Sequence, residues 1–231
     1  MKQDRQLADR FPDGAPPAGA DGEIRYREQN KRDKRRRIQS AARALFSKAG
    51  FENTTLREIA RKAGVALGTI SLYADDKRDL VLLIFSEEIA ALIERAAKAP
   101  RKSQSLADQL TAFFGEFYKE YAREPTLYRM LLRENLFYGR STHSAAFKEN
   151  VRRIIDCIEA LIVAQQKAGR MAAGVDPALV GRHFFFVFFA AVRWWITDDK
   201  PVAKDGIADL RRLFRLTVSG VAPQRARRSR A

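Results

Sequence analysis

Apolar residues recur every three or four positions along most of the chain, and this period constrains the fold more than any other feature. Such spacing puts apolar side chains on one face of an α-helix, whereas a half-buried strand needs strict alternation. The pattern begins near Lys31 and runs to the C-terminal region without an alternating segment of useful length. The sequence therefore predicts an all-α protein of about nine helices.

Capping residues and helix-ending glycines and prolines divide the periodic region into helices. We expect helices over about residues 33–49, 55–63, 66–73, 77–99, 105–123, 125–138, 144–168, 177–195 and 203–219. Thr55 and Glu58 have the spacing of a capping box, and Asp76 stands at an N-cap position. Pro177 follows Asp176 as a proline does at the first helical position.

The composition limits the classes of protein to which the chain can belong. It has 43 Lys and Arg against 28 Asp and Glu, a net charge of +15, which favours a polyanionic partner such as nucleic acid. A single cysteine, Cys157, excludes an internal disulfide, and the N-terminus lacks the apolar stretch of a signal peptide. The longest apolar run, residues 184–192, is too short for a membrane span. We expect a soluble, cytoplasmic protein.

The positive charge is concentrated around two short helices. Between Arg25 and Leu80, fifteen Lys and Arg stand against seven Asp and Glu. A basic run by itself is often only a solvated surface. Here it contains a capped helix and a second, shorter helix joined across Gly64, which is the order of a helix-turn-helix. In that motif the second helix enters the major groove of DNA.

Residues 50–80 contain the pattern Gly50-Phe51-x-x-Thr54-Thr55-Leu56-x-x-Ile59-Ala60-x-x-Ala63-Gly64-Val65-x-x-Gly68-Thr69-Ile70-x-x-Tyr73-x-x-x-Lys77-x-x-Leu80. This spacing resembles the DNA-binding domain of the TetR family of bacterial transcriptional repressors. The resemblance implies a DNA-binding domain over residues 31–92, with its helix-turn-helix at about 55–74, and a ligand-binding and dimerisation domain over 93–220. Prolines, glycines and mixed charges without periodicity predict a disordered arm over residues 1–30, and arginines mark a basic tail over 221–231.

The resemblance also implies roles for single residues. Thr55 and Arg57 resemble positions that meet DNA phosphates, and Tyr73 and Lys77 resemble a backbone-contacting tyrosine and lysine. The residues expected to face base edges from the recognition helix are Ala66, Leu67, Gly68, Thr69 and Ser71. Ser71 and Ala74 stand where the family often has aromatic residues. Arg25, Arg27 and the basic run 31–37 are therefore expected to act as an arm on phosphates or in the minor groove.

Two functions are expected of the C-terminal body. Dimerisation through the last two helices is implied, with Phe188, Arg193, Trp194, Trp195 and Leu213 as interface residues. A pocket for a hydrophobic inducer is implied, lined by Phe113, Phe117, Tyr121, Tyr128, Arg133, Phe137, His183 and Phe184. Both sets also fit an ordinary core, and this interpretation stays open. His183, which stands among phenylalanines, is expected to be a buried core residue.

Nothing in the sequence favours an enzyme, a metal or a cofactor. The only histidines, His143 and His183, have no partner at metal-ligand spacing, and Cys157 lies in an apolar run. Gly64 and Gly68 are not followed by the lysine of a phosphate-binding loop.

We therefore expect a homodimeric repressor that binds a palindromic DNA operator and is released by a hydrophobic small molecule. One alternative is a regulator of the same architecture that has no small-molecule ligand or acts through a protein partner; another is an activator. A membrane-surface binder would leave the pattern of residues 54–77 without a purpose.

Overall fold

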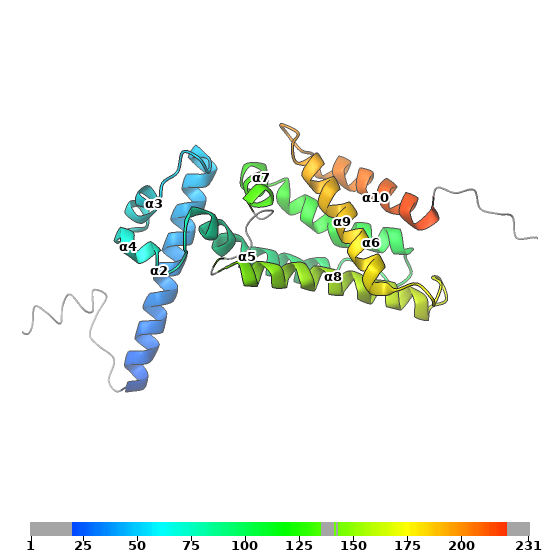
Figure 1. Ribbon diagram of the computed structural model, residues 1–231, viewed down its shortest axis with the longest axis horizontal. Coiled ribbons are helices and arrows are strands. Elements are labelled where there is room, and N and C mark those ends of the chain that lie inside the picture. The colour runs from blue at the N-terminus through cyan, green and yellow to red at the C-terminus, as the bar shows by residue number, and fades with distance from the viewer. Residues whose placement is uncertain (1–19, 135–140, 142, 221–231) are drawn as a thin grey trace, which may run out of the picture. The chain divides into compact units, whose positions relative to one another are not determined.

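Every regular element that the computed structural model describes is an α-helix (Figure 1). The described residues are 20–134, 141 and 143–220. The helices are α2 (Ala20–Ala49), α3 (Leu56–Ala63), α4 (Leu67–Ile70), α5 (Lys77–Ala96), α6 (Leu106–Tyr121), α7 (Pro125–Glu134), α8 (Ser144–Lys167), α9 (Pro177–Trp195) and α10 (Ala203–Ser219). The prediction of an all-α fold is confirmed. No helix within these ranges is both long and apolar enough to cross a membrane.

The helices fall into two compact units, the first ending at Tyr73 and the second beginning at Ala74. The first unit holds α2, α3 and α4. Helix α5 belongs to the second unit because it packs on α6, α7 and α8. The structure thus divides the chain at Tyr73, whereas the resemblance placed the boundary at residue 92. The basic tail 221–231 and the start of the arm, residues 1–19, lie outside the described residues.

The predicted caps form the hydrogen bonds that their spacing indicates. The Thr55 hydroxyl accepts from the Glu58 N–H at 3.2 Å, and the Glu58 carboxylate accepts from the Thr55 N–H at 2.9 Å, so the capping box is complete. The Asp76 carboxylate accepts from the first N–H groups of α5. The Asp176 carboxylate caps α9, with proline at its first position. These local contacts fix where three helices begin.

Helix α2 begins at Ala20, not near residue 33, so the expectation that residues 20–30 are disordered is wrong. Pairs of side chains three and four residues apart hold this extension in helical form. Arg27 pairs with Glu23 at 2.5 Å, and the Gln29 amide donates to the Asp33 carboxylate at 3.2 Å. No proline interrupts the sequence between residues 17 and 100. The prolines and glycines of residues 1–30, taken together, predict one disordered segment, although the last of these prolines is Pro17 and the helix begins after it.

The core of the second unit is a cluster of aromatic rings from three helices. Phe114 of α6 stacks on Phe188 of α9 with ring centroids 4.0 Å apart. Phe214 of α10 lies 5.8 Å from Phe114 and 5.2 Å from Phe184, centroid to centroid. All four rings are almost completely buried. Burial of each such side chain contributes about 1.5–3 kcal/mol, so the cluster is a main source of the stability of this unit.

The first turn of α5 is held by two buried carboxylates. Asp79 is fully buried, and its carboxylate accepts hydrogen bonds from the N–H groups of Asp75 at 3.1 Å and His143 at 3.0 Å. Glu134, at the end of α7, is also buried and pairs with Arg78 at 2.9 Å. Because a buried carboxylate without partners is costly, these contacts tie the start of α5 to the end of α7 and the start of α8.

Candidate DNA-binding surface and ligand domain

The turn between α3 and α4 depends on Gly64, the C-cap of α3. Gly64 has φ +63° and ψ 42°, a left-handed conformation that favours glycine. Its N–H donates to the Arg61 carbonyl at 3.2 Å, and the next N–H, of Val65, donates to the Ala60 carbonyl at 3.0 Å. The chain therefore reverses tightly after Ala63 and presents α4 as a short second helix, as the sequence predicted.

Arg37 on α2 braces this turn. Its Nε donates to the Ala63 carbonyl at 2.9 Å, and its Nη2 donates to the Gly64 carbonyl at 2.8 Å. The guanidinium thus satisfies acceptors left open at the end of α3. Sequence reasoning missed this role and counted Arg37 among the basic arm. No local pattern could have shown it, because the contact spans 26 residues.

Most of the predicted recognition residues are accessible. The exposed ones are Thr55, Arg57, Ala66, Leu67, Gly68 and Ser71. Thr69, Tyr73 and Lys77 are half-buried, and Lys77 begins α5 in the second unit. Leu72, which the sequence did not single out, is 81% exposed beside α4. The sequence could have drawn attention to Leu72, because it is an apolar residue at a position that the family pattern leaves open. A leucine on a DNA-facing surface can contact a thymine methyl group.

Thr55 and Tyr73 are already engaged within the first unit. The Thr55 hydroxyl donates to Glu58 at 2.8 Å, and hydrogen bonds from Thr55 to this exposed carboxylate lower the pKa of Glu58. The Tyr73 hydroxyl donates to the Lys31 carbonyl of α2 at 3.2 Å, and burial raises the pKa of Tyr73. Both side chains therefore position α3 and the end of the recognition segment as well as lying beside the expected DNA surface.

The predicted pocket residues pack against one another in the structure. Phe113, Phe117, Tyr121, Tyr128 and Phe184 are all at most 5% exposed, and Tyr121 stacks on Tyr128 with centroids 4.3 Å apart. Arg133 is exposed and pairs with Glu134 at 2.7 Å. Phe137 lies outside the described residues. His183 is exposed, so its prediction as a core residue is wrong; α9 turns Phe184, Phe185 and Phe188 inward and His183 outward.

The predicted interface residues separate into two groups. Phe188 and Trp195 are buried within the second unit, so the structure does not support the prediction that these two side chains contact a second copy of the chain. Arg193 is half-buried; it donates to the Leu132 carbonyl and lies 4.4 Å from the centroid of the Phe189 ring. Trp194 is 82% exposed, and Leu213 is half-buried. Helix α9 is apolar around most of its circumference, so the period alone did not reveal its inner face.

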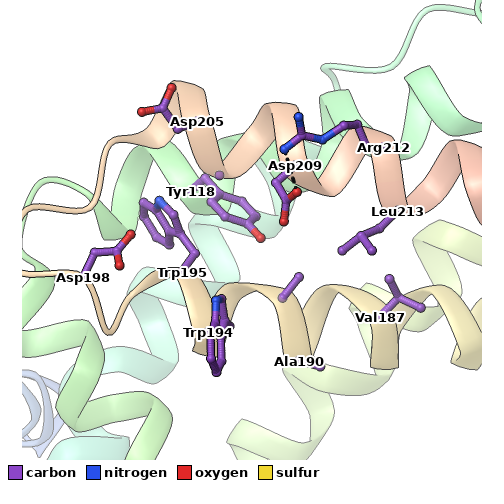
Figure 2. A pocket seen from close by; sticks show the side chains of 12 residues that line it. Tyr118, Val187, Ala190, Trp194, Trp195, Asp198, Asp205, Asp209, Arg212 and Leu213 are labelled. Atoms are coloured by element: carbon purple, nitrogen blue, oxygen red, sulfur yellow. Dashed lines mark hydrogen bonds and ion pairs between the residues drawn. The ribbon is translucent and has the colours of Figure 1, made fainter.

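A groove of about 720 Å³ lies between α9 and α10, with Trp194 at its edge (Figure 2). Its apolar wall includes Tyr118, Val187, Ala190, Trp195 and Leu213, and its polar residues are Asp198, Asp205, Asp209 and Arg212. Arg212 donates to Asp209 at 2.9 Å. Exposed apolar residues continue beyond the groove on the same two helices: Leu179 and Phe186 on α9, and Leu216 and Val218 on α10.

The described residues contain no group of three or more His, Cys, Asp and Glu side chains arranged to hold a metal ion. Cys157 is half-buried, and burial raises the pKa of its thiol. A raised pKa leaves less of the reactive thiolate at neutral pH.

Comparison with known proteins assigns the segment from the second half of α2 to the start of α5 to a family. Residues 38–84 match the family model described as bacterial regulatory proteins, tetR family. Among curated relatives, the fatty acid metabolism regulator protein of Bacillus subtilis is 23% identical over 193 residues, which cover 84% of this chain and 98% of that protein. The HTH-type transcriptional repressor KstR of Mycobacterium tuberculosis is 26% identical over 133 residues, covering 58% of this chain and 60% of that protein.

Solved structures show the same fold over most of the chain. FadR from Bacillus subtilis in complex with stearoyl-CoA aligns with a TM-score of 0.65 at 22% identity, covering 80% of this chain and 98% of that one. Thermus thermophilus FadR, a TetR family repressor in complex with lauroyl-CoA, aligns with a TM-score of 0.65 at 24% identity. The alignment covers 84% of this chain and 97% of that one. Residues 38–84 therefore carry the domain of the tetR family of bacterial regulatory proteins, and most of the chain shares the fold of the two FadR structures.

Proposed function

We propose that the protein is a homodimeric repressor that binds a palindromic operator and leaves it when a hydrophobic small molecule, an acyl-CoA thioester, binds the second unit. The observation that carries this proposal is the helix-turn-helix of the first unit. There a capped α3 and a braced turn at Gly64 present the exposed residues of α4. An accessible, rigidly held second helix is what major-groove reading requires.

Dimerisation is supported by the outer faces of α9 and α10. Leu179, Phe186 and Trp194 are each more than half exposed, and they recur seven and eight residues apart on α9. That spacing forms one apolar stripe along the helix. Leu216 is exposed on α10, three residues after Leu213 of the groove, and extends the apolar surface onto that helix. A surface of this kind on two neighbouring helices suits a self-complementary contact with a second copy.

The dimer can be tested on this stripe. Trp194→Arg puts a charge on an exposed apolar position, so it should shift the chain toward monomer in light scattering after size-exclusion chromatography. Leu72→Arg, a comparable change at an 81% exposed leucine in the first unit, is the matched control and should leave the mass unchanged. A wild-type protein that is monomeric at micromolar concentration would contradict the proposed dimer.

A two-fold dimer presents two copies of α4, so the operator should have two inverted half-sites whose centres lie about 34 Å, one DNA turn, apart or a multiple of it. Selection of bound sequences from a random duplex pool tests this directly. Recovery of a palindrome, with affinity that falls log-linearly as salt rises, would support the proposal. Enrichment of no sequence, or of a single asymmetric site, would oppose it.

The ligand class is inferred from the two FadR structures, which hold stearoyl-CoA and lauroyl-CoA. The second unit offers an apolar interior built from rings on α6, α9 and α10, and aromatic side chains are suited to enclose an acyl chain. Because each buried methylene contributes about 0.8 kcal/mol, affinity should rise by roughly fourfold per added carbon until the chain outgrows the space.

A series of acyl-CoA thioesters of increasing length tests this class, with CoA alone as the control. An inducer must raise the melting temperature and lower DNA affinity together, with a coupling of typically 1–3 kcal/mol. The ion pair between Arg78 and Glu134 gives α7 a direct contact with the start of α5, through which such a change can reach the segment following Tyr73. If no member of the series has either effect, the acyl-CoA assignment fails.

One observation favours a second candidate, a regulator of the same architecture without a small-molecule ligand. The rings expected to line a pocket fill the space among themselves, and Phe114 stacks directly on Phe188. In that case the operator would still be recovered, but no hydrophobic compound would change the melting temperature.

Whether the regulator represses or activates follows from the operator's position relative to the promoter, which footprinting on the recovered site would establish.

A further inference from the structure

A second basic feature of the first unit has no part in the helix-turn-helix itself. A groove of about 250 Å³ lies between the N-terminal half of α2 and Tyr73. Its lining residues on α2 are Glu23, Tyr26, Arg27, Asn30, Lys31 and Lys34. Because the Tyr73 hydroxyl donates to the Lys31 carbonyl at 3.2 Å, the groove is fixed against the end of the segment that contains α4.

The cations of this part of α2 are divided between two faces. Arg27, Lys31 and Lys34 follow one another at spacings of four and three, so they share one side of the helix and line the groove. Arg25 and Arg32 are seven residues apart and share another side. With 3.6 residues per turn, that side is turned by roughly 140° from the two lysines. A disordered arm would have no such faces.

The groove carries an excess of positive charge. Between residues 22 and 37 there are eight Lys and Arg against three carboxylates. Glu23 lies in the groove but is paired with Arg27 at 2.5 Å, which leaves the two lysines to set its local charge. Both lysine side chains are exposed. The two ammonium groups and the Asn30 amide line the same groove and form a donor set suited to phosphate oxygens.

We propose that this groove binds a phosphate of the operator backbone, so that α2 acts as a helical arm that contacts DNA through the Lys31 and Lys34 face. The inference rests on the proposed DNA-binding function and adds a site to it. Contacts of this type position a protein on the duplex without reading sequence. They strengthen binding to every sequence equally and leave the choice of operator to α4.

The size of the effect follows from counterion release. Each phosphate neutralised contributes about 0.9 to the slope of log affinity against log salt concentration. Two lysines in each of two protomers can therefore account for up to about 3.6 of that slope. Lys31→Gln with Lys34→Gln should lower the magnitude of this slope by about 2 or more, which corresponds to the loss of at least two phosphate contacts. The double substitution should also weaken binding on the order of tenfold or more at low salt.

The matched control lies on the same helix. Sequence reasoning counted Arg25 and Arg32 in the same basic arm, but neither residue lines the groove. Arg25→Gln with Arg32→Gln therefore removes the same charge from the other face and should change the slope by less than the loss of one contact, about 0.9. Lys31→Arg with Lys34→Arg keeps the charge and should retain the slope. All variants are measured as full-length protein on the recovered operator, and circular dichroism checks that their helix content matches the wild type.

Equal losses from the two neutralised pairs would mean that the arm has no binding face, and the proposal would be overturned. It would also be overturned if neither pair changed the slope, although operator binding by the wild type would then still stand. If the wild-type chain itself binds no duplex in a salt-dependent way, the proposed function fails first, and that result is visible before any variant is compared.

Discussion

An alanine at position 64 tests whether Arg37 and the turn of the helix-turn-helix depend on each other. A Cβ atom built on Gly64 would lie 2.6 Å from the Arg37 Nη2, closer than atoms can pack. The guanidinium would have to shift, and we expect the shift to break its bonds to the Ala63 and Gly64 carbonyls. Gly64→Ala should therefore remove the brace as well as strain the backbone at φ +63°.

The two costs can be separated by magnitude. The left-handed conformation costs a non-glycine residue about 1–2 kcal/mol. Because Arg37 is largely exposed, its two hydrogen bonds together contribute about 1–2 kcal/mol. Gly64→Ala should then lower the free energy of unfolding of the first unit by about 2–4 kcal/mol in the wild-type background. It should do so by only about 1–2 kcal/mol when Arg37 is already alanine.

The assay is a double-mutant cycle read by hydrogen exchange of the α3 amides. Both tryptophans, Trp194 and Trp195, belong to the second unit, so their fluorescence would not report unfolding of the first. Exchange rates of protected amides convert to the free energy of opening for the segment that contains them. The expected coupling between the two substitutions is about 1–2 kcal/mol.

Additive effects, with a coupling below about 0.5 kcal/mol, would refute the reasoning. In that case Gly64→Ala would not act by breaking the hydrogen bonds of the Arg37 guanidinium. A further check is DNA affinity, which should fall for both single variants if the brace holds α4 in its reading position.

Three other predictions concern packing and pH. Gly206→Ala should destabilise the second unit by about 1–3 kcal/mol relative to Gly115→Ala in urea unfolding. Both glycines lie between α6 and α10, but a Cβ at 206 would meet buried rings at 2.5 Å, and one at 115 would meet only an isoleucine at 3.5 Å; equal effects would contradict this packing. Phe114→Ala should cost about 3–5 kcal/mol in the same assay, and a loss under 1 kcal/mol would show that the ring cluster is loose. The lowered pKa of Glu58 means that its capping contribution is complete above its ordinary pKa and is lost as pH falls through the depressed value. Thr55→Ala should therefore flatten the acidic limb of a pH profile of α3 exchange, and an unchanged profile would exclude the capping box as its source.

The sequence by itself determined the features that depend on neighbours along the chain. The three-and-four period, the capping residues and the glycine between α3 and α4 act over a few residues, and the structure confirms the fold and the caps that they predicted. The family pattern over residues 50–80 belongs to the same class of signal, because one short motif carries all of its positions.

Only the tertiary structure decided which apolar side chains face inward and which cations act together. The period could not orient α9, since its apolar residues surround most of the helix. Packing against α6 and α10 buried Phe188 and left Trp194 exposed. The brace from Arg37 and the contact of Tyr73 with α2 join residues 26 to 42 positions apart. Contacts of that kind form only when helices pack, because their free energy depends on the geometry between elements and not on the sequence within one.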